Sequence, residues 1–187
     1  MKKILFSILT VTAIAGLVGG ATYAVFSNKV TSGPNTFATG NADLRLRHQT
    51  SQAWADSYGG SNWGNLYPGW NDSYNVYLQN NSSSPIVLRA FPQVTNTTGN
   101  GIMLDNVYLQ FLYADGTPAL DSSGSPCGNV PLRWWLDNPD TFDIGDLDQG
   151  QDRGPWVAKF SIPTTADNTI ADKSLNFDLV INGIQQP

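Results

Sequence analysis

The stretch DNVYLQFLYADGT, residues 105–117, decides the fold because it alternates apolar and polar side chains and then ends in a turn. Side chains two positions apart lie on the same face of an extended strand. Asp115-Gly116 is typical of a tight hairpin turn. The stretch therefore predicts a half-buried β-strand with a hairpin after it. Its predicted inward residues are Val107, Leu109, Phe111 and Tyr113.

The same period-two pattern recurs along the chain, with clusters of Gly, Asn, Ser, Asp and Pro between the runs. Such a profile is typical of an all-β chain, and seven or eight strands in one domain predict an antiparallel two-sheet β-sandwich. The further predicted strands are ADLRLRH (42–48), SYNVYLQN (73–80), PIVLRAF (85–91), VPLRWWLD (130–137), WVAKFSI (156–162) and KSLNFDLVINGI (173–184). In the last strand, Asn176, Asp178 and Asn182 are predicted to face outward. The predicted long loops are 49–72, 95–104, 114–130 and 137–155.

Residues 1–24 have the composition of a secretory signal peptide. Lys2 and Lys3 are followed by an apolar run over residues 4–18. This run is shorter than the roughly 20 residues that a transmembrane helix needs. We therefore expect a signal helix that is cleaved, and an uncleaved N-terminal anchor is the alternative.

Small residues at the end of the leader place the predicted cleavage between Ala24 and Val25, because a signal peptidase accepts small side chains before the cut. Cleavage leaves 163 residues, enough for one domain with a sizeable core. It also removes two lysines and no acid, so the formal charge changes from −5 to −7. This charge argues against binding to nucleic acid, and membrane contact is expected only before cleavage.

An exported chain with a single cysteine does not depend on internal disulfides. Cys127 lies in the turn-rich segment SSGSPCGN, where an incidental thiol is expected and intermolecular pairing is the alternative.

The sequence lacks the residues of the common hydrolytic motifs. His48 is the only histidine and the chain has no glutamate, so a zinc site of the HExxH kind cannot form. We expect no catalytic residues and interpret His48 as a solvated loop histidine. The acidic segment 137–154 is the best metal candidate, since Ca²⁺ prefers oxygen ligands such as those of Asp146, Asp148 and Asp152. A solvated acidic loop without a cofactor is the preferred interpretation.

Three tryptophans share a segment rich in Gly and Asn: Trp54, Trp63 and Trp70. Aromatic side chains pack in cores and at protein interfaces. On the surface of a sandwich they could also stack on sugars. A secreted carbohydrate-binding module is therefore the alternative function for this chain.

Two N-terminal segments, GGATYAVFSNK (19–29) and NTFATGNADL (35–44), resemble the start of the TasA/camelysin (CalY) family of secreted biofilm-fibre proteins. The segment NLYPGW (65–70), with the strand that follows it, and the C-terminal segment 168–185 are also similar to that family. Trp70 and Asn41-Ala42 depart from the family pattern.

The resemblance implies a jelly-roll sandwich and processing by a SipW-type signal peptidase. It also implies a secreted structural subunit, located in the extracellular matrix or at the cell surface. Subunits would assemble head to tail into fibres by donor-strand complementation, with matrix accessory proteins or polysaccharide as further partners. Some members carry a metalloprotease label, which the missing histidines argue against here. The implied organisation is a signal peptide (1–24), a donor-strand segment and hinge (25–34) and a jelly-roll domain (35–187).

The start of the processed chain supports a donor strand on physical grounds. Val25, Phe26 and Val30 are apolar, and with Asn28 they form the expected donor strand. Burying one such apolar side chain contributes about 1.5–3 kcal/mol. A strand added to an open edge also pairs the free backbone groups of that edge. The alternative is that residues 25–32 pack on their own subunit as an edge strand.

Overall fold

The computed structural model describes residues 27–30, 42–61, 63–64 and 66–186. The predicted cleavage residues Ala24 and Val25, and Phe26 of the predicted donor strand, lie outside these ranges. Within them, no helix is both long enough and apolar enough to cross a membrane.

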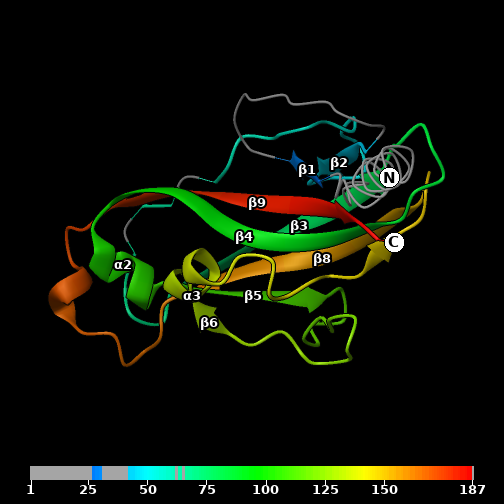
Figure 1. The fold of residues 1–187 in the computed structure, drawn as a ribbon. Coiled ribbons are helices and arrows are strands. Elements are labelled where there is room, and N and C mark those ends of the chain that lie inside the picture. Colours follow the sequence, from blue (N-terminus) through cyan, green and yellow to red (C-terminus); the bar gives the residue numbers. More distant parts are fainter. Residues whose placement is uncertain (1–26, 31–41, 62, 65, 187) are drawn as a thin grey trace, which may run out of the picture.

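Two antiparallel sheets form the body of the protein (Figure 1). The first has the order β1-β9-β4-β7 and the second has the order β2-β3-β8-β5-β6. The strands of the first sheet are β1 (Ser27–Val30), β9 (Leu175–Gln185), β4 (Leu88–Gly99) and β7 (Asp146–Leu147). Those of the second sheet are β2 (Leu44–Arg47), β3 (Asn71–Asn80), β8 (Asp152–Ser161), β5 (Tyr108–Tyr113) and β6 (Val130–Pro131). The prediction of a mostly β chain with two antiparallel sheets is confirmed.

The alternating stretches meet as expected in the second sheet. In the β5–β8 pair, Leu109 is opposite Phe160 and Phe111 is opposite Ala158, and all four side chains are buried. Phe160 also lies 5.8 Å, centroid to centroid, from Phe177 on β9. Val107, Leu109 and Phe111 therefore lie in the core as predicted, whereas Tyr113, the fourth predicted inward residue, is exposed at the end of β5.

The predicted strand 130–137 is wrong over most of its length. Only β6 is extended there, and α3 (Leu132–Asp137) follows it. Leu132 and Trp135 are the buried residues of this helix, and their spacing of three puts them on one helical face. A short apolar run is compatible with the repeat of either a strand or a helix, and here the burial of two residues on one helical face selects the helix.

The predicted loop 95–104 is also wrong. β4 continues to Gly99 with a bulge between Thr95 and Thr98, and α2 (Gly101–Asn106) follows. The side chain of Asn100 accepts a hydrogen bond from the Ile102 amide and caps this helix. The polar sequence of this part of β4 matches its exposure near the end of the strand, which is why it resembled a loop.

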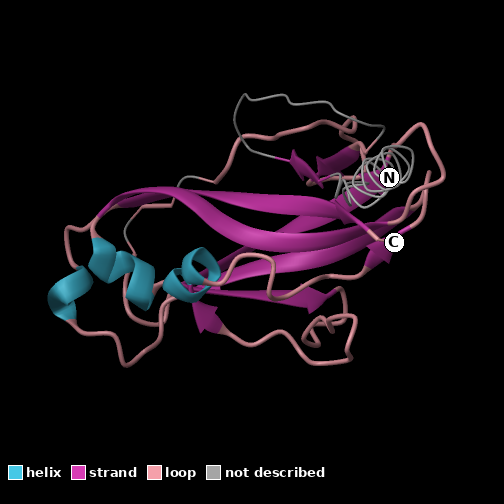
Figure 2. Ribbon diagram, viewed as in Figure 1, coloured by secondary structure: helices cyan, strands magenta, loops and turns pink. Residues whose placement is uncertain are grey.

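Asn182 was predicted to face outward but is buried. Its side-chain amide donates to the Asp140 carboxylate at 3.0 Å, because the chain after α3 covers this part of β9. The short helices α2, α3 and η1 (Asn168–Ile170) gather toward one end of the sheets (Figure 2).

Candidate functional site

The edge of the first sheet carries the only part of the predicted donor strand that the structure describes. β1 pairs antiparallel with β9, with Ser27 opposite Ile184, Asn28 opposite Gly183 and Val30 opposite Ile181. In the single chain this strand thus lies on its own subunit, which is the alternative that the sequence left open. If β1 of one chain paired with another chain in the same register, it would occupy this same edge of β9.

β1 covers less than half of β9. On its other side, β9 pairs with β4 from Leu175 to Gln185, whereas β1 reaches only Ile181–Ile184. Among the described residues, no strand pairs with positions 175–180 on the β1 side. An uncovered edge of this kind offers backbone donors and acceptors to another strand.

A cleft of about 710 Å³ adjoins this uncovered edge and is walled by both sheets. One wall is β9 from Leu175 to Ile181, and the other includes Tyr74 and Val76 of β3. The loop between β2 and β3 contributes Trp63 and Trp70. The cleft therefore has a mixed apolar and polar lining beside a strand edge with which no described strand pairs.

Two of the three predicted tryptophans meet in this cleft. The Trp63 ring lies 5.5 Å from Trp70 in an edge-to-face arrangement and 4.8 Å from Phe160. The Trp63 indole N–H donates to Asp72 at 2.7 Å. Both tryptophans are half-buried, so they extend the core toward the cleft.

Trp54 lies apart from this pair. Its ring stacks under the Arg47 guanidinium, with 4.1 Å between the guanidinium carbon and the ring centroid. A cation above an aromatic ring at this distance is a favourable contact. The three tryptophans therefore do not form one aromatic platform.

His48 lies in the loop just after β2 and is half-buried, so part of its ring stays open to solvent, as expected, while the rest packs on neighbouring rings. The ring contacts Tyr58 and Tyr74 edge-to-face, and Nδ1 lies 2.9 Å from the Asn75 carbonyl oxygen. Because a carbonyl only accepts, this contact fixes Nδ1 as the protonated nitrogen. Burial raises the pKa of Tyr74 above its usual range, so its hydroxyl stays neutral.

The three carboxylates of the predicted calcium site lie in different surroundings. Asp146 makes a bidentate ion pair with Arg89, Asp152 accepts a hydrogen bond from Gln79, and Asp148 is exposed. The Arg89 pair holds the pKa of Asp146 below its usual range. In the described ranges, no three His, Cys, Asp or Glu side chains come together as metal ligands would.

Cys127 belongs to the core, although its sequence context predicted a loop thiol. Its sulfur accepts a hydrogen bond from the Phe111 amide at 3.3 Å. Burial raises the pKa of the thiol to about 11, which leaves little reactive thiolate.

Sequence reasoning missed Tyr58, Tyr74 and Phe177 as cleft residues. The alternation in residues 173–184 puts Phe177 on the core face, but only the register between distant strands shows that no described strand pairs with this part of β9 on the β1 side. No protein-family model and no curated protein matches the chain. The fold and site define a mostly β, two-sheet protein in which, among the described residues, part of one strand edge has no neighbouring strand.

Proposed function

We propose that the chain is a secreted, non-enzymatic subunit of extracellular matrix or cell-surface fibres, built as a jelly-roll sandwich. After removal of residues 1–24, its N-terminal segment pairs with the sheet of the next copy. The observation that carries the proposal is the position of β1, a four-residue strand at the edge of β9 beside an uncovered edge and a cleft.

Exchange of β1 between copies costs little in backbone pairing. A strand from a second copy in the same register makes the hydrogen bonds that the chain's own strand gives up. Each copy then has one donor and one acceptor, which produces an open filament and no closed ring.

The uncovered part of β9 can accept more of the donor than β1. If the register of the β1–β9 pair continues, residues 31–34 of a second copy lie opposite positions 177–180. Pro34 has no amide hydrogen for the ladder and suits the end of the donor. We therefore propose the β9 edge as the acceptor, with residues 25–34 as the donor segment.

A peptide of residues 25–34, VFSNKVTSGP, tests this assignment. Added in excess to the chain that begins at Val25, it is expected to occupy the β9 edge and stop filament growth, as followed by light scattering and negative-stain microscopy. A scrambled peptide of the same composition is the control. Equal growth with both peptides would contradict the assignment of the acceptor edge.

A carbohydrate-binding module is the second candidate, because Trp63 and Trp70 line one cleft. It predicts that alanine at either position abolishes glycan binding and that the chain remains monomeric. The rings pack on each other and on Phe160, which favours a role in the core over an open platform.

A further inference from the structure

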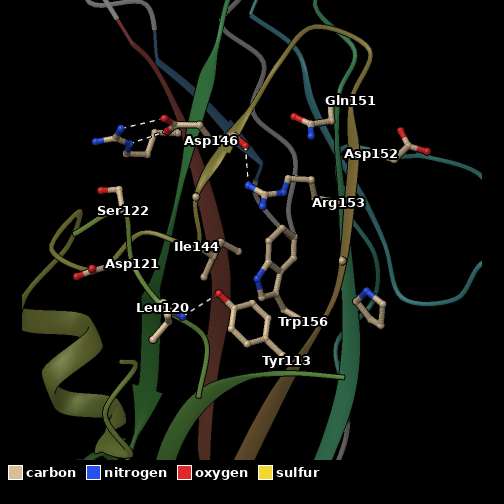
Figure 3. Close-up of a pocket in the computed structure, with 14 residues that line it drawn as sticks. Tyr113, Leu120, Asp121, Ser122, Ile144, Asp146, Gln151, Asp152, Arg153 and Trp156 are labelled. Atoms are coloured by element: carbon tan, nitrogen blue, oxygen red, sulfur yellow. Dashed lines mark hydrogen bonds and ion pairs between the residues drawn. The ribbon is translucent and has the colours of Figure 1, made fainter. Parts of the chain in front are cut away.

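A second cleft lies at the opposite side of the sandwich from β1. Its residues come from β4 and β7 of the first sheet, from β5 and β8 of the second, and from the turn 120–122, whereas β1 is the opposite edge of the first sheet. Figure 3 shows it between the turn 120–122 and the chain around residues 144–156. Its volume is about 780 Å³, within the usual range for small-molecule sites.

The apolar surface of this cleft is fixed in place. The Tyr113 ring is 37% exposed and Leu120 is 45% exposed, which is unusual for side chains of this size. The Tyr113 hydroxyl accepts a hydrogen bond from the Leu120 amide at 3.1 Å, so the ring is held against the turn (Figure 3). Ile144 and Trp156 line the cleft and are themselves buried.

A buried carboxylate holds the two sides of the cleft together. Asp143, only 6% exposed, accepts hydrogen bonds from the Ser122 amide and hydroxyl and from the Gly145 amide. These bonds join the turn 120–122 to the chain that leads into β7. The cleft is therefore preformed, and a ligand need not order these segments.

Arg153 supplies a cation that makes no direct ion pair with a carboxylate of the described residues. Its Nη1 donates to the Asp146 carbonyl oxygen at 2.9 Å, and no carboxylate oxygen lies within 4.0 Å. The guanidinium lies on Gly145, where an added Cβ would come within 2.9 Å of Nη1. The pKa of Asp146 is lowered mainly by its bidentate pair with Arg89, and the charge of Arg153 adds to this without a direct ion pair.

Each of the other described arginines either makes an ion pair or stacks on an aromatic ring. Arg45, Arg89 and Arg133 make ion pairs with aspartates, and Arg47 stacks on Trp54. Among the described residues, Arg153 makes neither an ion pair nor a cation–π contact, and its guanidinium donates to one backbone carbonyl. Its other N–H groups are available to a ligand.

Trp156 offers a second donor in the same cleft. Its indole lies between Tyr113 and Arg153 (Figure 3), and its N–H donates to no group of the described residues. A donor without a protein partner gains a hydrogen bond when a ligand supplies an oxygen.

We propose that this cleft binds a carboxylate-bearing sugar, a hexuronic acid unit, with its carboxylate on Arg153 and its ring against Tyr113 and Leu120. The planar fork of a guanidinium matches a carboxylate. The exposed Tyr113 side chain, with polar groups around it, suits a sugar ring, which has both apolar faces and hydroxyl groups. Asp121, Asp146 and Asp152 also line the cleft, and this negative charge disfavours a phosphate dianion.

Titration calorimetry of the full-length chain with digalacturonic acid tests the proposal. Arg153→Gln is expected to weaken binding about tenfold or more, because a charge-assisted pair is lost. Arg133→Gln is the matched control, since that arginine pairs with Asp105 outside the cleft. The dimethyl ester of the same disaccharide keeps the sugar rings and loses the charge. Its affinity for the unmodified chain is expected to be as low as that of the acid for the Arg153→Gln variant.

Absence of binding by the acid would overturn the proposal, as would equal binding of acid and ester. Equal affinity of the Arg153→Gln variant and the unmodified chain would overturn the role of Arg153. Circular dichroism of each variant shows whether the fold is kept, and Tyr113→Ser provides an independent change on the apolar side. None of these results depends on filament formation, so they stand apart from the test of the fibre.

Discussion

Without residues 25–32, the processed chain is expected to form no filaments, whereas the chain that begins at Val25 forms them. The truncation removes all of β1, so no copy can donate a strand to the β9 edge. The body should still fold, because β9 keeps its pairing with β4 from Leu175 to Gln185. Negative-stain microscopy measures the filaments, and circular dichroism checks the β content.

The outcomes of this truncation separate the candidate functions. Filaments from both chains would show that assembly uses another surface. Monomers from both chains would favour the carbohydrate-binding module. Filaments from the longer chain alone are the result that donor-strand assembly predicts.

Trp135→Ala is expected to destabilise the protein by about 3–5 kcal/mol, the range for removing a large aromatic side chain from a core. Trp135 is 1% exposed, and its ring lies 5.6 Å from Phe111 and 6.0 Å from Phe142. Its indole N–H also donates to the Leu109 carbonyl oxygen at 3.1 Å. Urea unfolding followed by far-UV circular dichroism measures the loss.

Trp134→Ala is the matched control for this substitution. Trp134 is adjacent in the sequence and of equal size, but it is only half-buried. Its replacement should cost clearly less than that of Trp135. An equal or larger loss for Trp134 would mean that α3 does not insert Trp135 into the core as described.

Much of the fold was predictable because apolar and polar residues alternate along the sequence of most of its strands. The stretches that become β5 and β8 place their apolar residues at every second position, and these residues meet across the pair. In the predicted strands 42–48 and 73–80, apolar residues two positions apart are likewise buried, namely Leu44 and Leu46, and Val76 and Leu78.

The errors occurred where local pattern does not determine structure. In 130–137 a short apolar run fits two periods, and packing of Leu132 and Trp135 selects the helix. In 95–99 a polar sequence forms the exposed end of a long strand. The burial of Asn182 depends on Asp140, 42 positions away in the sequence.

The candidate site was less predictable than the fold. Composition indicated a free N-terminal strand, but only long-range pairing shows which edge it meets. Trp63 and Trp70 were correctly grouped, whereas Trp54 was grouped with them only because it is close in sequence. No sequence pattern pointed to Arg153, since the lack of a direct ion pair, on which its proposed role depends, shows only in the fold.

Cross-linking between two differently marked chains tests the strand-exchange account most directly. One processed chain carries Ser27→Cys and the other carries Ile184→Cys, positions that are opposite each other in the β1–β9 pair. Opposite residues in antiparallel strands have Cα atoms about 4.5–5.5 Å apart, which a disulfide can bridge. Cys127 can remain in both chains, because burial raises the pKa of its thiol to about 11.

Filaments grown from the mixture and then oxidised are expected to give disulfide-linked dimers of the two chains on a non-reducing gel. Neither chain alone should give them. If the mixed filaments contain no cross-chain bond, while a chain with both substitutions closes the bond within itself, β1 stays on its own subunit and the proposed assembly is wrong.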